Sequence, residues 1–232
     1  MTLDAPWKIL LVLVALGAVR LALWANGGSR KHWRQSLAEF IDSAIIALAL
    51  VFLVIRPFVI QSFYIPSGSM ENTLLKGDRI LVNKFIYHFE EPRPKDVVVF
   101  RAPPAASAEP RDFIKRLVGV PGDHIKIECG VLYRNGVPQD EPYIKEPPIQ
   151  DFPTPEMYAA GGVYTLTAET YEPTQIYVDK DGLYVPPGYL WMLGDNRNGS
   201  HDGRKWGYTP RENVIGKAMF IFWPPHRIGF VR

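Results

Sequence analysis

Two long apolar runs near the N-terminus constrain the fold of this chain more than any other feature. The first covers residues 7–25 and is interrupted only by Lys8 and Arg20, and the second covers residues 40–60. About 20 apolar residues form a helix that spans a bilayer, so the sequence predicts two transmembrane helices. A cleaved signal peptide is the alternative for the first run, but its apolar core is about 7–15 residues long. A buried helix of a soluble protein is the alternative for the second.

The segment between the two runs is basic. Residues 27–35 carry three basic side chains, whereas Lys8 is the only basic residue at the other end of the first run. Because basic loops tend to stay in the cytoplasm, we expect this loop to be cytoplasmic. The expected organisation is a membrane anchor over residues 1–61, followed by an extracytoplasmic domain over residues 62–232.

After residue 62 the pattern becomes that of β-structure, with short runs rich in β-branched and aromatic residues. Asn135-Gly136 is a strong hairpin signal, and 21 prolines and 19 glycines favour a loop-rich β protein over a helical bundle. The predicted fold class is mainly β: an antiparallel β-sheet domain with an inserted, proline-rich β/loop subdomain at about residues 146–186, preceded by two transmembrane helices. Strands are predicted over residues 79–87, 96–100, 113–120, 124–128, 131–134, 175–178, 183–185, 189–193 and 214–223.

Charge and cysteine content exclude several function classes. The net charge of +2 is too small to indicate nucleic-acid binding, and no stripe of Lys and Arg with interleaved aromatic residues occurs. The five histidines are scattered without metal-ligand spacing, and Cys129 is the only cysteine. We therefore expect no nucleic-acid partner, no metal, no cofactor and no intrachain disulfide.

Three polar clusters of the predicted β domain are candidates for chemistry. In the first, Ser67 and Ser69 flank Gly68 in a tight, proline-led segment; the alternative is an ordinary Ser/Gly turn. The second surrounds Lys115, and the third is the polar run over residues 194–204. That run lacks the spacing of a calcium loop or a Walker phosphate loop, and a simple buried polar turn is its alternative reading.

Lys115 and Arg116 lie next to each other in a predicted strand. Strand alternation places them on opposite faces, so one of the two should face the interior. A buried lysine loses solvation and its pKa falls, and a neutral lysine can accept a proton from a serine. The alternative is that both side chains extend to solvent. A pair of Ser69 with His201 is disfavoured, because a catalytic triad is assembled in space and the adjacent residues 200–202 point different ways.

Four stretches occur in an order that resembles a known family. They read PSGSM over residues 66–70, KDVVVF over 95–100, IKRLVGVPGD over 114–123 and GDNRNGSHDGR over 194–204. Each stretch alone is a weak signal, but the four together, after two apolar runs, resemble the bacterial type I signal peptidases, or leader peptidases. The resemblance covers most of residues 36–225. It implies a membrane-bound serine endopeptidase that removes signal peptides from exported preproteins after Ala-x-Ala-like sites.

The same resemblance implies a role for each matching residue. Ser69 would be the nucleophile and Lys115 the general base, in a dyad without histidine. Ser67 would join the backbone N–H of Ser69 in an oxyanion hole, and Ser200 would orient the Lys115 amine. Asp202 and Arg204 would form a supporting ion pair. The small substrate pockets would be shaped by Phe63, Ile65, Leu74, Ile80, Phe113 and Ile114.

The resemblance also implies a location and partners. The protein is expected in the bacterial inner membrane as a multi-pass protein, with the catalytic domain on the extracytoplasmic side and with preprotein signal peptides and membrane lipid as its partners. The alternative function is a membrane-anchored β domain that binds peptides or partners without catalysis. A soluble Ser–Lys autoprotease of the SOS-repressor type is disfavoured by the two apolar runs.

Overall fold

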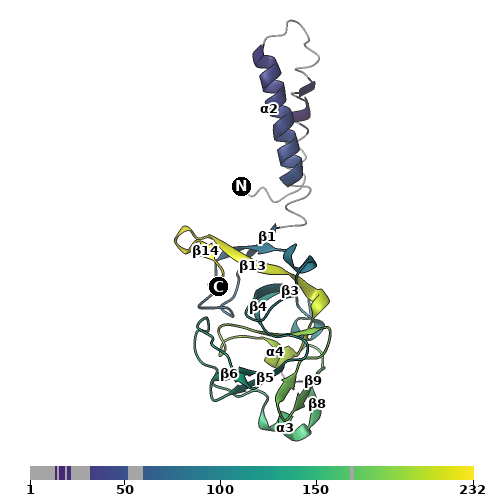
Figure 1. Cartoon of the computed structure of the whole chain (residues 1–232), viewed down its shortest axis with the longest axis vertical. Helices are drawn as coiled ribbons and strands as arrows, with labels where there is room; N and C mark the ends of the chain where they lie inside the picture. The colour runs from purple at the N-terminus through teal and green to yellow at the C-terminus, as the bar shows by residue number, and fades with distance from the viewer. Residues whose placement is uncertain (1–13, 15, 19, 22–31, 52–59, 168–169) are drawn as a thin grey trace. The chain divides into compact units, whose positions relative to one another are not determined.

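The computed structural model describes residues 14, 16–18, 20–21, 32–51, 60–167 and 170–232. The chain separates into two compact units, Met1–Gln61 and Ser62–Arg232. In the first unit, helix α2 covers His32–Ala49 (Figure 1). The Nε of Arg20 donates a hydrogen bond to the Oδ1 of Asp42 at 2.8 Å, so these two charged residues of the apolar runs neutralise each other.

Large parts of the predicted membrane anchor lie outside the described residues. This applies to much of the first run, to residues 27–31 of the basic loop and to residues 52–59 of the second run. Helix α2 begins at His32, so the end of the predicted loop is helical. Within the part of the chain that the structure describes, no helix combines the length and apolar character needed to cross a bilayer. The two-helix anchor therefore stays a prediction.

The second unit contains two antiparallel sheets, which confirms the prediction of a mainly β, antiparallel fold. The first sheet has eight strands in the order β1-β2-β13-β3-β4-β11-β12, and β14 pairs with β13. Its strands are β1 (Ile60–Tyr64), β2 (Arg79–Asn83), β3 (Val97–Arg101), β4 (Asp112–Gly119), β11 (Tyr189–Leu193), β12 (Thr209–Pro210), β13 (Val214–Trp223) and β14 (Gly229–Phe230).

The second sheet has six strands in the order β7-β6-β5-β10-β9-β8. These are β5 (His124–Glu128), β6 (Val131–Arg134), β7 (Val137–Pro138), β8 (Gly162–Leu166), β9 (Thr174–Asp179) and β10 (Gly182–Tyr184). In Figure 1 its labelled strands lie together in the lower half of this unit, below β3 and β4. The smaller sheet therefore includes the hairpin at Asn135-Gly136 as well as strands from the predicted insertion.

Short helical turns connect the strands, and their ends follow local rules. Pro155 occupies the first turn of α3 (Pro155–Ala160), and Gly161 closes it in the left-handed conformation. The strand predicted over residues 79–87 ends at Asn83. The side-chain carbonyl of Asn83 accepts hydrogen bonds from the backbone N–H groups of Phe85 and Ile86, which turns the chain away from the strand. The other helical turns are α4 (Gly203–Trp206), η2 (Ile86–His88), η3 (Pro104–Ala106), η4 (Arg211–Asn213) and η5 (Pro225–Arg227).

Strand β4 lies at the junction of three hydrophobic clusters. Ile114 packs against the cluster beneath β2 and β13, Leu117 belongs to the cluster around Trp206, and Val118 belongs to the cluster of the second sheet. Both faces of β4 are therefore covered by protein. As a result Lys115 and Arg116 are both buried, with 5% and 1% of their surfaces exposed. The strand pattern had predicted that only one of the two faces the interior.

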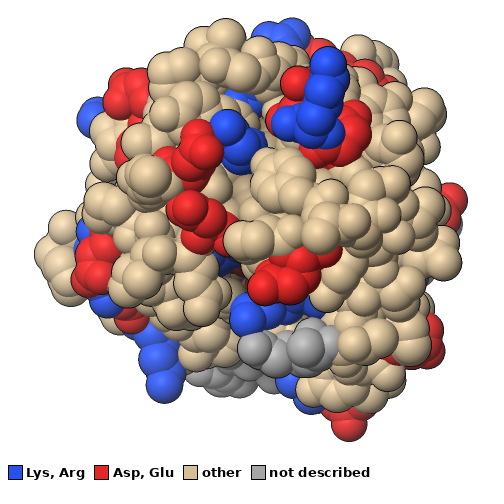
Figure 2. Space-filling view, turned by 90° about the horizontal axis from the view of Figure 1, so that it is seen from below, with Lys and Arg blue, Asp and Glu red and all other residues tan. Residues whose placement is uncertain are grey.

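The face of the molecule in Figure 2 carries acidic and basic side chains close to one another. In the second sheet, the Nζ of Lys126 pairs with Glu128 at 2.9 Å, and the Nε2 of His124 lies 3.0 Å from Asp179. In Figure 2 the two signs are interspersed and form no large field of one sign, which is the feature that would steer a strongly charged partner.

Substitution of Gly216 tests how closely β13 approaches β2. A Cβ atom there would fall inside contact distance of the carbonyl oxygen of Asn83, which is part of the β2 backbone. We expect Gly216→Ala to lower the free energy of unfolding by about 1–3 kcal/mol, as overpacking does. Gly229→Ala is the matched control, because the nearest atom lies 3.9 Å from its Cβ position, and the expected change is within about 0.5 kcal/mol. Equal urea midpoints for the two variants would contradict this view of the interface.

Candidate active site

Ser69 lies in a tight turn between β1 and β2. The backbone N–H of Leu74 donates to the carbonyl of Met70 at 2.8 Å, and the N–H of Gly77 donates to the carbonyl of Ile65 at 2.9 Å. The side chains of Met70 and Leu74 are completely buried. The buried Met70 anchors the turn in the core, and the preceding Ser69 is half-buried.

Lys115 reaches this turn from the middle of β4. Its Nζ lies 2.6 Å from the Oγ of Ser69, within hydrogen-bond distance. The hydroxyl of Ser67 donates to the same Oγ at 3.4 Å. The ring of Phe113, two residues earlier on the same face of β4, has its centroid 5.8 Å from Nζ. The structure thus brings together Ser67, Ser69 and Lys115, as the resemblance predicted.

Burial changes the protonation of the lysine. Desolvation lowers the pKa of Lys115 to about 8, although the nearby carboxylates of Asp202 and Asp195 oppose this shift. When Nζ is protonated it donates to Ser69; when it is neutral, the same short contact allows the serine hydroxyl to donate to it. The pair can therefore transfer a proton from serine to lysine, which is what activates a serine nucleophile.

Asn196 holds the backbone at Gly68 and Ser69. Its N–H donates to the carbonyl oxygen of Ser69 at 3.1 Å, and its side-chain amide donates to the carbonyl oxygen of Gly68 at 3.0 Å. Asn196 belongs to the polar run over residues 194–204, but no role for it was predicted from the sequence. The residue type was a signal for this role, because an asparagine can donate hydrogen bonds from both its side-chain amide and its backbone N–H to the same turn.

A buried ion pair anchors the same run to β4. The Nε and Nη2 of Arg116 donate to the two carboxylate oxygens of Asp195 at 2.8 and 2.7 Å, and both side chains are almost fully buried. The hydroxyl of Thr73 also donates to Asp195. Arg116 lies next to Lys115 on the opposite face of β4, so this pair fixes the run beside the lysine. Sequence reasoning missed it because the partners are 79 residues apart.

Asp202 and Arg204 form the ion pair that the resemblance implied. The Nε of Arg204 donates to Oδ1 and its Nη2 to Oδ2, each at 2.9 Å, and the N–H of Gly194 donates to Oδ2 at 3.0 Å. Burial alone would raise the pKa of Asp202, but the hydrogen bonds and charge of Arg204 outweigh burial and hold this pKa below its usual value. The carboxylate therefore closes the loop over residues 194–202.

Ser200 does not make its expected contact with Lys115. Its Oγ is buried and has no hydrogen-bond partner among the described residues. The Oγ lies against Gly194, where a Cβ atom would collide with it. The hydroxyl therefore faces the backbone of the loop, and the orientation of the lysine amine in this structure comes from Ser69.

The residues expected to shape substrate pockets fall into two groups. Ile65, Leu74 and Ile80 are buried at 2% or less and share one hydrophobic cluster, against which Phe63 and Ile114 pack with part of their surface exposed. Phe113 packs instead with the cluster around Trp206. The fully buried members form the floor beneath the site, and only the partly exposed ones offer a surface to a ligand.

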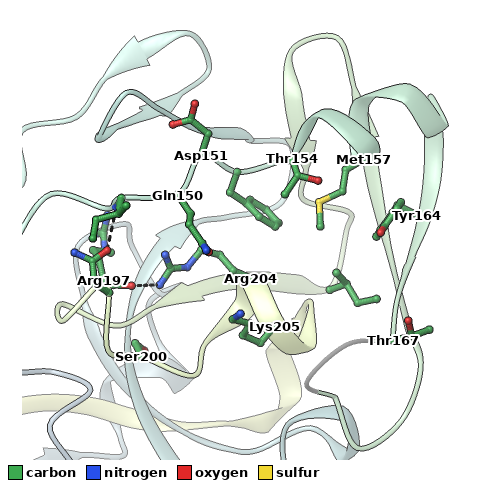
Figure 3. Close-up of a pocket in the computed structure, with 14 residues that line it drawn as sticks. Gln150, Asp151, Thr154, Met157, Tyr164, Thr167, Arg197, Ser200, Arg204 and Lys205 are labelled. Carbon is green, nitrogen blue, oxygen red and sulfur yellow. Dashed lines mark hydrogen bonds between the residues drawn. The ribbon is translucent and has the colours of Figure 1, made fainter.

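A cavity of about 450 Å³ lies beside the loop that carries Arg197 and Ser200. In Figure 3 these loop residues form one wall, and Met157, Tyr164 and Thr167 form the other. Neither member of the serine–lysine pair lines this cavity. The cavity is therefore separate from the contact between Ser69 and Lys115.

Among the described residues, His124, Asp179 and Asp181 form a group whose ligand atoms lie within 4.8 Å of one another. Asp179 already contacts the Nε2 of His124 at 3.0 Å and accepts a hydrogen bond from the N–H of Asp181 at 2.9 Å. The group lies in the second sheet, away from β4. The arrangement is accounted for by these hydrogen bonds at the turn between β9 and β10.

Comparison with known proteins gives consistent matches over most of the chain. Residues 37–223 match the sequence profile of the family described as signal peptidase, peptidase S26. The chain is 38% identical over 197 residues to a signal peptidase I of Leptolyngbya laminosa, with 83% of each chain covered. It is 36% identical over 199 residues to a probable signal peptidase I-1 of Synechocystis sp., covering 84% of this chain and 87% of the relative. A signal peptidase I of Mycobacterium tuberculosis is 32% identical over 243 residues, covering 86% and 76%.

Asp195→Asn tests the buried ion pair. The substitution keeps the shape of the side chain but leaves the Arg116 charge buried without a countercharge, which costs about 3–5 kcal/mol of stability. Denaturant unfolding measures this loss. The matched control is Glu109→Gln in the exposed pair with Arg111, for which at most about 1 kcal/mol is expected. Similar losses in both variants would show that the buried pair does not anchor the loop.

Proposed function

The chain belongs to the signal peptidase family, peptidase S26, and from this premise we propose that it removes signal peptides from exported preproteins through a Ser69–Lys115 dyad. The observation that carries the proposal is the 2.6 Å contact between the lysine Nζ and the serine Oγ, in a setting that lowers the lysine pKa to about 8. Members of this family are serine peptidases, so the chain is a hydrolase.

In the first half-reaction, neutral Lys115 accepts the proton of the Ser69 hydroxyl while the Oγ attacks the carbonyl carbon of the scissile peptide bond. The carbonyl oxygen becomes an oxyanion, which the Ser67 hydroxyl and the backbone N–H of Ser69 would stabilise. A single donor of this kind contributes about 10²–10³ in rate. The position of Ser67, whose hydroxyl lies 3.4 Å from the Ser69 Oγ, supports this role.

Collapse of this tetrahedral intermediate breaks the peptide bond, and the Lys115 ammonium gives its proton to the departing amine. The signal peptide is then held as an ester on Ser69. In the second half-reaction, neutral Lys115 accepts a proton from water, whose oxygen attacks the ester carbon. The bond between that carbon and the Ser69 Oγ then breaks, and the Lys115 ammonium gives its proton to Oγ, which regenerates the serine hydroxyl and the neutral lysine. The chemistry needs only the serine, the base and water, so we propose no metal and no cofactor.

The turn over residues 65–78, between β1 and β2, carries Ser69, and we call it the nucleophile turn. The substrate site would lie along this turn. The partly exposed Phe63 and Ile114 supply its apolar walls, and the buried Leu74 and Ile80 limit its depth from below. A shallow apolar site accepts small side chains, which supports cleavage after Ala-x-Ala-like sequences. Signal peptides end in small residues of this type.

We also propose that the N-terminal unit anchors the protein in the bacterial inner membrane, with the second unit on the extracytoplasmic side. The 2.8 Å contact of Arg20 with Asp42 supports an anchor made from both apolar runs, because charged residues inside membrane segments pair with one another. Membrane lipid and the signal peptides of preproteins would then be the partners.

Removal of either dyad member tests the activity. We expect Ser69→Ala and Lys115→Ala each to reduce processing of a preprotein by a factor of about 10³ or more, as for other nucleophile–base pairs. Detergent-solubilised proteins are incubated with the preprotein, and mass spectrometry locates the cut. Lys126→Ala, in β5 of the second sheet, is the matched control and should process normally. Cleavage by the Lys115→Ala protein at the wild-type rate would exclude the dyad, and absence of cleavage by the wild type would exclude the function.

The pH dependence of the reaction tests the lysine as base. Because the pKa of Lys115 is lowered to about 8, most of the lysine is protonated at pH 6 and most is neutral at pH 10. The rate of Ser69 acylation should therefore rise about tenfold per pH unit below 8 and level off above about pH 9. Single-turnover reactions with a serine-directed acylating peptide mimic measure this rate. A flat profile across the range would rule out Lys115 as the group that activates Ser69.

A further inference from the structure

Residues 139–145, which follow β7, cross the site without contributing to the dyad, and we call this segment the strap. The dyad members are 46 residues apart in sequence and come from two separate elements, a turn and a strand. A third element, the polar loop that begins at Gly194, holds the backbone around Ser69. The strap contacts all three of these elements.

The strap contacts the nucleophile turn through Asn72. The side-chain amide of Asn72 donates to the carbonyl oxygens of Tyr143 and Ile144 at 3.1 and 3.2 Å. Asn72 has a φ of 89°, a left-handed conformation that asparagine tolerates better than most residues. Lys145 adds an ion pair with Glu71 at 2.8 Å. The turn is therefore held on the side facing the strap, three residues beyond Ser69.

The strap contacts β4 through the ring of Tyr143. The guanidinium carbon of Arg116 lies 3.7 Å from the centroid of this ring, a stacking distance. Arg116 directly follows Lys115 in β4, and its guanidinium also donates to Asp195. The ring therefore covers the arginine that fixes the backbone beside the catalytic lysine.

The strap contacts the polar loop at two points. The N–H of Lys145 donates to the carbonyl oxygen of Asp195 at 2.9 Å. The Glu141 carboxylate, whose side chain is 5% exposed, accepts hydrogen bonds from both terminal nitrogens of Arg197, with the Nη1 contact at 2.8 Å. The hydroxyl of Tyr143 donates to the same carboxylate at 2.9 Å. Glu141 thus couples the ring over Arg116 to the loop that holds Ser69.

We propose that the strap is a positioning element for catalysis, with the Tyr143 ring as its central residue: it holds the nucleophile turn, β4 and the polar loop in the relative placement that keeps the Ser69 Oγ against the Lys115 Nζ. The inference rests on the proposed dyad. None of the strap side chains touches the reacting atoms, so they act through Arg116, Asp195 and Asn72. Misplacing reacting groups by about 1 Å costs roughly 10² in rate.

Tyr143→Ala is the direct test. It removes the ring from Arg116, and we expect the rate constant for Ser69 acylation by the peptide mimic to fall about 10–100-fold, while the KM for the mimic stays within about threefold. Tyr143→Phe keeps the ring and should restore the rate to within about threefold of the wild type. Tyr133→Ala is the matched control, because this ring also lies near a cation, Lys126 at 5.3 Å, but in the second sheet.

A second variant keeps the inference testable if Tyr143→Ala does not fold. Asn72→Gly removes both hydrogen bonds to the strap while permitting the positive φ, and it should also lower the acylation rate constant without a matching rise in KM. Melting temperatures are measured for each variant. The inference is wrong if folded Tyr143→Ala and Asn72→Gly react at the wild-type rate, or if Tyr143→Phe is as slow as Tyr143→Ala.

The same experiments separate this inference from the proposed function. If the wild-type protein is acylated at Ser69 but does not cut a preprotein, the proposed substrate is wrong and the strap can still be judged from the acylation rates. If the wild type cuts the preprotein and the strap variants do so at its rate, the strap inference fails while the function stands.

Discussion

The burial of two consecutive basic side chains on β4 is the constraint on which the site depends. Lys115 and Arg116 point to opposite faces, and protein covers both faces. A buried charge must be paired or lost, and the two residues meet this requirement differently. Arg116 is paired with the Asp195 carboxylate, whereas desolvation lowers the pKa of Lys115 to about 8. One strand therefore provides both the arginine that anchors the polar loop and the lysine that we propose as the base.

The anchor explains why distant segments converge on Ser69. Asp195 binds Arg116, and the next residue, Asn196, donates to the carbonyl oxygens of Gly68 and Ser69. The loop thus transmits the position of β4 to the nucleophile turn. The strap adds a second connection, since the Tyr143 ring lies 3.7 Å from the guanidinium carbon of Arg116. The single contact between Ser69 and Lys115 is in this way supported by buried, directional interactions around it.

Local patterns predicted much of the fold and part of the site. The strands β5, β6, β11 and β13 have the bounds expected from their β-branched and aromatic runs. The motifs located Ser69 and Lys115, which lie in contact, and the Asp202–Arg204 ion pair. The grouping of strands into two sheets was not predictable in this way, because pairing depends on contacts between segments far apart in sequence. The resemblance predicted that Ser200 contacts Lys115, but its hydroxyl has no hydrogen-bond partner among the described residues, because such partners also depend on contacts between distant segments.

The sequence by itself determined the family, the β character of the second unit and the identity of the serine and lysine, because short motifs and strand periodicity are local properties. Only the tertiary structure decided that both Lys115 and Arg116 are buried, that Asn196 clamps the nucleophile turn, and that residues 139–145 join the three parts of the site. Burial and hydrogen-bond partners are properties of the packed chain. A strand pattern states which face a side chain takes, but neighbouring elements decide whether that face meets water.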